Sequence, residues 1–353
     1  MPRRHRSLAV RARYALGRVG YSAWLGLALA APPAVAAEVD SYTRRPPSLP
    51  DATEILNAEV NRRIDRAIAF ANAEPHAAEP KRCDTERLLA GLEDLFGGLV
   101  FGEIERYANA LPQRFRHDTP LAQSIYQDLS LVEAPTLVTY GALAGLIQVH
   151  GVLIGTDKLG HFFSDGQTYF RRYHQQGLPI ADTLLGGEIS ELSVFGSMVT
   201  GIFSYADLVA NFQGMRFWNR VLGEAPDILS QRRPHPYIAC ANGRLQRTHD
   251  FDWRDYVDPA WDEAVNCNRY SNPTILSKTL WRQHETGAGS ACRHEQRLLA
   301  PLRERYGRYA NRLLNGRAEV VERRLLDAIG EFLGRRQPRI ETDEHDPGCC
   351  PPG

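Results

Sequence analysis

An uncharged stretch of 23 residues, Ala134 to Thr156, limits the folds open to this chain more than any other feature. About 20 apolar residues suffice to cross a bilayer, so the stretch fits a membrane span as well as a buried helix. Leu192–Ala206 is also uncharged, but it has only 15 residues and carries three serines and a threonine. Because so short a span mismatches the bilayer, we interpret both stretches as core helices. A paired re-entrant arrangement is the alternative.

Residues 1–37 have the pattern of a secretory signal peptide. Six arginines lie in the first 18 residues, an apolar stretch follows from Ala23 to Ala31, and the small residues Ala34-Val35-Ala36 form a cleavage site. We therefore expect an exported protein, either periplasmic or membrane-associated on the periplasmic side. Without these arginines, 36 basic and 42 acidic side chains remain. That acidic balance argues against a nucleic-acid partner.

Six cysteines follow this segment, and an exported chain with an even number of cysteines is expected to form disulfides. Six cysteines allow 15 pairings, which the sequence cannot separate. Our first choice is Cys240 with Cys267, which flank an irregular stretch, and our second is Cys83 with Cys292. No C-x-x-C pair is present, so the usual zinc and redox motifs are missing.

The pattern of apolar residues predicts a mainly α-helical fold with a bundle-like core. Apolar residues recur every four to five positions from Ile55 to Ile68, which is typical of an amphipathic helix. A second helix is expected from Asp84, a capping residue, to about Leu111 before Pro112. After the leader we expect a linker at 38–50 and a helical core at 51–230. A long irregular insertion rich in proline and aromatic residues, pinned by a disulfide, follows at 231–290. The chain then ends in a basic amphipathic helical segment at 291–336 and a disordered tail at 337–353.

The basic C-terminal segment has a helical repeat that includes Leu298, Leu302, Tyr306 and Leu313. Between Arg293 and Arg336 it carries 11 arginines and six acids. Such a helix can dock on an anionic membrane surface, although arginines on a solvent-facing helix are the commoner arrangement.

The segment from Gly155 to Asp165 carries the densest set of chemically useful side chains. On a helix, Asp157, His161 and Asp165 are four residues apart and therefore share one face. Lys158 lies next to the first of them. Histidine with a nearby carboxylate is a frequent acid–base pair in enzymes.

Two further polar pairs border the apolar stretch that begins at Leu192. Glu188 and Glu191 are spaced i,i+3 before it, and Asp207 and Asn211 are spaced i,i+4 after it. Buried carboxylates are costly unless they are paired. If the three helical faces meet, their polar groups must bind one another, a metal or a substrate.

We weigh an enzymatic role against a structural one for these residues. In the first, His161 is a general base or metal ligand, Asp157 orients it, and the remaining acids act as proton donors or ligands. Those acids are Glu188, Glu191 and Asp207, and the further binding residues are Lys158, Asp165 and Asn211. In the second, each residue is a cap or a satisfied polar group, and the set locks helices together. A Glu-x-x-His pair and a G-x-S-x-G elbow are both missing, so the metal and any cofactor stay open.

The order Asp157-Lys158-x-x-His161-Phe162, an acidic residue at 188–191 and then Asp207-x-x-x-Asn211-x-x-Gly214 resembles the motifs of the VanZ-like family. The first motif is also similar to that of small periplasmic proteins with a D-K-x-x-H-F string. The resemblance covers residues 150–215 only. It lacks the family's glutamine three residues after the glutamate, and Tyr205-Ala206 replaces an expected arginine. The resemblance implies a cell-envelope protein with a buried polar site, and it does not imply a particular reaction.

The sequence therefore leaves two functions open. One is a hydrolase that acts on envelope lipid or glycan through the Asp/His/Glu site. The other is a non-catalytic envelope scaffold in which the same cluster is structural.

Overall fold

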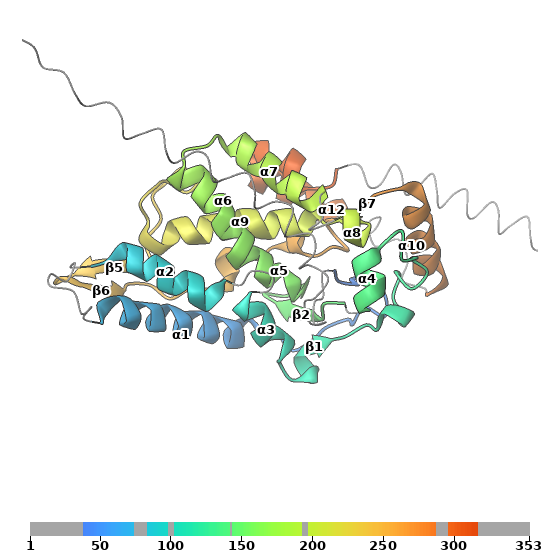
Figure 1. Cartoon of the computed structure of the whole chain (residues 1–353), viewed down its shortest axis with the longest axis horizontal. Coiled ribbons are helices and arrows are strands. Elements are labelled where there is room, and N and C mark those ends of the chain that lie inside the picture. Colours follow the sequence, from blue (N-terminus) through green and yellow to red (C-terminus); the bar gives the residue numbers. More distant parts are fainter. Residues whose placement is uncertain are drawn as a thin grey trace, which may run out of the picture. The chain divides into compact units, whose positions relative to one another are not determined.

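The computed structural model describes residues 38–73, 83–97, 102–141, 143–192, 197–286 and 296–316. These residues form a mainly helical fold, as the sequence predicts (Figure 1). The expected leader at 1–37 and the expected disordered tail at 337–353 lie outside them. Among the described residues, no helix combines the length and apolar character that a membrane span requires.

The main helices are α1 (Thr53–Asn72), α2 (Thr85–Phe96), α3 (Glu103–Asn109), α4 (Pro135–Tyr140), α5 (Asp157–Gly160), α6 (Gly166–Phe170), α7 (Ile180–Leu192), α8 (Ser197–Thr200), α9 (Tyr205–Leu222), α10 (Pro273–Glu285), α12 (Gln296–Tyr306) and α13 (Ala310–Leu313). The strands are β1 (Arg116–His117), β2 (Leu146–Val149), β3 (Val152–Gly155), β4 (Ile202–Phe203), β5 (Ile238–Ala241), β6 (Arg244–Arg247) and β7 (Arg269–Tyr270). They form three small antiparallel sheets with the orders β1-β2-β3, β4-β7 and β5-β6.

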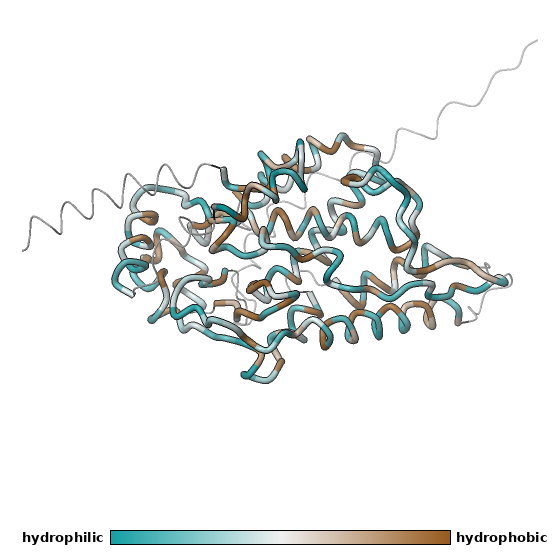
Figure 2. Tube along the Cα trace, turned by 180° about the vertical axis from the view of Figure 1, so that it is seen from behind, coloured by the Kyte–Doolittle hydropathy of each residue, from teal (hydrophilic) through white to brown (hydrophobic). Residues whose placement is uncertain are grey.

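Helix α1 is the amphipathic helix expected from the N-terminal apolar repeat. Leu56, Val60 and Ile64 are buried on one face, and the helix packs against α2. Figure 2 shows hydrophobic and hydrophilic residues following one another within the turns of this helix. Such a stripe buries apolar area while the opposite face stays in water.

The predicted extent of the second helix, from Asp84 to Leu111, is wrong. Asp84 does cap α2, since its side chain accepts a hydrogen bond from the Arg87 amide. However, α2 ends at Phe96 because Gly97 takes an extended conformation, and α3 begins after Gly102, which is extended as well. Glycine loses more backbone entropy in a helix than other residues do, so the two glycines favour a break.

The uncharged stretch from Ala134 to Thr156 is a helix only at its start, so the prediction of a core helix through it is wrong. Helix α4 stops at Gly141, whose φ of 65° is left-handed. Strands β2 and β3 then form a hairpin whose turn residues, His150 and Gly151, both have positive φ. Paired positive φ values suit the tight turns of hairpins, and the β-branched residues of this stretch pack well on strands.

Leu192–Ala206 is not one helix either. Helix α7 ends at Leu192, and the described part of the stretch contains the short helix α8, strand β4 and the start of α9. Strand β4 pairs with β7, in which Arg269, the partner of Phe203, lies 66 residues further along the chain. The prediction of one core helix here is wrong because strand β4 depends on this distant partner, which the local apolar content does not show.

The centre of the fold is built where α9 crosses the continuous helical run from α5 through α6. The backbones touch at Gly166 and Gly214, where a methyl group on either residue would overlap the other. Between α5 and α6, residues His161–Asp165 form a π-helical turn. Such turns are frequent at functional sites because they re-aim side chains.

An aromatic core lies beside this crossing. Phe162 packs against Trp253 and Trp261 with ring centroids 4.9 Å and 5.8 Å apart. Both tryptophans come from the region predicted as an irregular insertion, and both are fully buried. That region is therefore part of the core, and its residues Pro273–Glu285 form the regular helix α10, not irregular chain.

The disulfide of this region is Cys83–Cys240, with Cα atoms 5.7 Å apart. It joins β5 to the residue before the cap of α2, and both predicted pairings, Cys240 with Cys267 and Cys83 with Cys292, are therefore wrong. Cys267 is also disulfide-bonded. The β5-β6 hairpin lies against the ends of α1 and α2, where Asn72 of α1 bonds the backbone of Leu245 (Figure 1). Contacts between segments far apart in the chain thus decide the pairing.

The C-terminal helical pattern is confirmed over α12 and α13, and residues 317–336 of it lie outside the described part. Leu302 and Tyr306 are buried as expected, but Leu298 is exposed and its neighbour Leu299 is buried instead. The helix also breaks at Gly307, whose φ is 52°.

Candidate functional site

Members of all three groups of polar residues predicted from the sequence, around His161, Glu191 and Asp207, meet at the crossing of the central helices. Helix α5 and the π turn supply Asp157, Lys158 and His161, and the first two turns of α9 supply Asp207 and Asn211. Ser204 caps α9 and accepts a hydrogen bond from the Asp207 amide, which fixes the start of that helix. Because the helices meet at glycines, their side chains face each other at short range.

Lys158 occupies the centre of this cluster and is fully buried. Its Nζ donates hydrogen bonds to Asp157 Oδ2 and Glu263 Oε1, both at 2.6 Å, and lies 2.6 Å from Asp207 Oδ1. Burial alone lowers the pKa of Lys158, but the attraction of the three carboxylates is stronger and raises this pKa well above its usual range. Lys158 is therefore an ammonium ion at neutral pH.

The three carboxylates around Lys158 differ in their pKa values. Burial raises the pKa of Glu263 to about 7, although Lys158 opposes the shift. Burial also raises the pKa of Asp157, again against the attraction of Lys158. For Asp207, the positive charges of His161 and Lys158 outweigh burial and hold the pKa far below its usual range. Asp207 is thus the firmly ionised acid of the cluster.

His161 lies between this buried cluster and the surface. Its Nε2 is 3.1 Å from Asp207 Oδ2, and its Nδ1 is 3.2 Å from Asp165 Oδ2 and 3.2 Å from the Asn211 amide. Burial alone lowers the pKa of His161, but the two carboxylates raise it well above its usual range. About 25% of the His161 side chain is exposed, against 3% for Asp207. His161 is therefore an imidazolium that solvent can reach.

Further acids surround the cluster. Burial raises the pKa of Glu105 on α3 to about 8, and the Asp157 charge adds to that effect. Burial raises the pKa of Glu191 on α7 to about 8 as well, followed by the Asp207 charge, while its Oε1 accepts a hydrogen bond from the Ser204 amide. Burial and then the Glu263 charge raise the pKa of Glu38. These acids hold protons near neutral pH, which limits the negative charge in the core.

Glu188 is the one predicted acid that lies apart from the cluster. It pairs with Arg312 of α13 at 2.8 Å, whereas Glu191, one turn later, is buried against α9. Asp157 contacts Lys158, and it is Asp207, not Asp157, that holds the imidazole of His161. Asp165 is half exposed beside His161.

Three cluster residues escaped the sequence analysis: Glu38, Glu105 and Glu263. Glu263 lies 105 residues from Lys158, in a stretch that was noted only for its aromatic residues. Its neighbours Trp261 and Ala264 are buried, and an acid within a run of aromatic and apolar residues is the sequence signal that could have identified it. Glu38 and Glu105 have no tryptophan beside them and give no such signal.

Asp157, Asp207 and Glu263 also present oxygens close enough together to bind a metal ion, all lying within 4.8 Å of one another. In this structure the Lys158 ammonium contacts all three, so it supplies the positive charge that a metal would otherwise bring. An imidazolium is no metal ligand, so His161 in its charged form does not extend the triad. The arrangement favours proton chemistry at His161.

No protein-family model matches this chain, and no curated protein or solved structure is significantly similar to it.

Proposed function

We propose that the protein is an exported hydrolase of the cell envelope, with lipid or glycan as its substrate, in which His161 and Asp165 are the acid–base pair. The observation that carries this proposal is that His161 is in reach of solvent while it belongs to a buried network of ionisable groups. Perturbed titratable groups gather at active sites because catalysis needs them. Asp207 supports the charge of the imidazolium from its buried side.

The proposed reaction uses both exposed groups. His161 donates its Nδ1 proton to the leaving oxygen as the bond to that oxygen breaks, and Asp165 accepts a proton from the attacking water, whose oxygen forms the new bond. The proton then returns from Asp165 to His161, whose Nδ1 is 3.2 Å away. Both groups finish in their starting states, so the cycle balances.

The envelope location rests on two observations. Cys83 and Cys240 form a disulfide, and such bonds persist mainly in oxidising compartments. The N-terminal 37 residues have the pattern of an export signal, and the VanZ-like motif order supports the same location. The resemblance itself stays a prediction.

The test is to incubate the purified protein with isolated envelope lipids and glycans and to identify the products by mass spectrometry. We expect cleavage products with the native chain and at least a hundredfold slower release with His161→Gln, since a general acid contributes roughly that factor or more. Asp165→Asn should slow release as well. The matched control is His174→Gln, the same substitution outside the cluster, which should keep the native rate.

The scaffold is the second candidate, and one observation favours it. Lys158 joins α5, α9 and the segment around Glu263 through direct ionic contacts, which is how a buried polar lock would be built. If no product is released, and if His161→Gln and Asp165→Asn restore the envelope phenotype of a deletion strain as well as the native chain does, the scaffold is correct and the hydrolase is not.

A further inference from the structure

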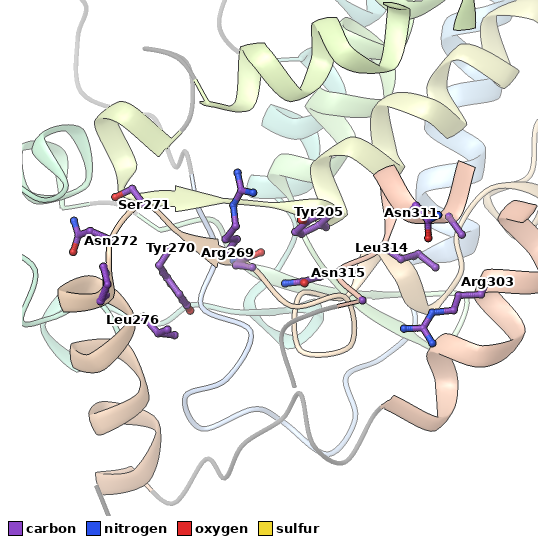
Figure 3. Close-up of a pocket in the computed structure, with 14 residues that line it drawn as sticks. Tyr205, Arg269, Tyr270, Ser271, Asn272, Leu276, Arg303, Asn311, Leu314 and Asn315 are labelled. Carbon is purple, nitrogen blue, oxygen red and sulfur yellow. The ribbon is translucent and has the colours of Figure 1, made fainter. Parts of the chain in front are cut away.

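A polar pocket of about 870 Å³ lies away from His161, between β7, the start of α10 and the helices α12 and α13. Figure 3 shows Tyr270 and Arg303 on opposite sides of it. A volume of this size is typical of sites that bind small molecules. The residues that line the pocket include several asparagines and two tyrosines.

The charge of this pocket is positive. Arg269 and Arg303 line it, and no acidic side chain does. Within the described parts of the chain, neither arginine forms an ion pair with a carboxylate, and Arg269 lies over the Phe203 ring at 4.5 Å. Arginines without acid partners are well suited to bind a phosphate group.

One residue of the pocket lining, Asn268, also has a buried acceptor atom that finds no hydrogen-bond donor among the described residues. Asn268 is only 4% exposed, and its Nδ2 donates to Glu263 Oε2 at 2.7 Å. Its Oδ1 has no donor among the residues that the structure describes. Since buried polar atoms are normally satisfied, this oxygen calls for a donor such as a ligand hydroxyl.

A groove of about 610 Å³, lined by both apolar and polar residues, adjoins the pocket and shares the wall Arg269 to Asn272 with it. Its apolar lining includes Val132, which is 93% exposed, and Met198, which is 65% exposed. The same apolar surface extends along α7 through three exposed residues spaced by four and three positions: Leu185, Ile189 and Leu192. Glu133 also lines the groove, but Lys278 neutralises it at 2.7 Å.

We propose that the pocket and the groove together bind one anionic membrane phospholipid whose headgroup carries a hydroxyl. Arg269 and Arg303 bind the phosphate, Asn268 accepts a hydrogen bond from the headgroup hydroxyl, and an acyl chain lies along Val132 and Met198. Exposed apolar surface beside unpaired arginines is complementary to a lipid, whose charged and apolar parts are joined in one molecule. This site is separate from His161 and holds whether or not the hydrolase is correct.

The headgroup half of the site is tested with vesicles of phosphatidylglycerol mixed with phosphatidylcholine, and with vesicles of phosphatidylcholine alone. We expect the native protein to bind the mixed vesicles more tightly. Arg269→Gln with Arg303→Gln should weaken this binding by about thirtyfold, on the order of fivefold for each arginine. The control removes the same charge from the exposed pair Arg232 and Arg233. An equal loss with the control would show unspecific attraction and overturn the site.

The acyl half is tested with Val132→Ser combined with Met198→Ser. Both side chains are exposed, so the variant should fold. We expect about tenfold weaker vesicle binding and unchanged binding of soluble glycerol phosphate, which has no acyl chain. If glycerol phosphate binds as tightly as the vesicles, or the variant binds vesicles as the native protein does, the lipid is refuted. His161→Gln should bind vesicles normally, so loss of hydrolysis and loss of lipid binding are separate results.

Discussion

Replacing Lys158 by methionine tests the central claim about the buried cluster. The substitution keeps the length of the side chain and removes the charge that contacts Asp157, Asp207 and Glu263. Breaking a buried ion pair by removing one partner typically costs about 3–5 kcal/mol, because the remaining charge is left without compensation. Here three carboxylates share the ammonium, so we expect the upper part of that range near pH 8.

The loss should depend on pH in a definite direction. Without the ammonium, the carboxyl groups of Asp157 and Glu263 will have folded pKa values even further above their unfolded values. The folded variant then binds more protons than the unfolded chain between roughly pH 5 and pH 8, so its stability falls as pH rises. We therefore expect Lys158→Met to be much closer to the native protein at about pH 5 than at about pH 8.

Urea unfolding gives the measurement, with the fluorescence of buried tryptophans such as Trp253 and Trp261 as the signal. Lys278→Met is the matched control, because Lys278 pairs with Glu133 near the surface and its loss should cost less than about 1 kcal/mol. Equal stability of Lys158→Met and the native protein near pH 8 would refute the account of the cluster.

A smaller substitution extends the same test to metal binding. Lys158→Ala vacates the space between three carboxylates whose oxygens lie within 4.8 Å of one another. We expect Mn²⁺ or Ca²⁺ to raise the melting temperature of this variant and to leave that of the native protein unchanged. A metal-dependent rise in the native protein would mean that the ammonium does not fill the site.

Three other predictions concern stability and are measured by urea unfolding. Gly214→Ala should cost about 1–3 kcal/mol, since the added methyl overlaps the backbone of the facing helix. Gly91→Ala should be neutral or stabilising, because its methyl meets the exposed Phe70 ring, which can move aside, and makes only ordinary contact with the Ala67 backbone. Replacing Cys83 and Cys240 by serine should cost about 2–4 kcal/mol, and ready alkylation of both thiols in the native protein would contradict the bond. The pKa of Glu191 is raised to about 8, so native stability should fall as pH rises from about 5 to 8, and Glu191→Gln should flatten that slope.

Local sequence patterns predicted the elements whose formation depends on residues close together in the chain. The apolar repeat from Ile55 to Ile68 places α1, and Asp84 caps α2 as its type suggests. The hairpin of β2 and β3 was missed because an uncharged stretch of β-branched residues and glycines suits either a buried helix or buried strands. Gly151, between the apolar runs Leu146–Val149 and Val152–Gly155, is the local sequence signal for the turn.

The helical spacing of Asp157, His161 and Asp165, and of the pair Asp207 and Asn211, can be read from the sequence, because it follows from the repeat of an α-helix. The central place of Lys158 can be read only from the fold, because its partner Glu263 lies 105 residues away. The Cys83–Cys240 bond also follows only from the fold, because its two cysteines are 157 residues apart in the chain. Helical spacing is a local property of the chain, whereas burial and charge pairing are set by which distant segments pack together, and burial is what turns ordinary acids into a coupled site.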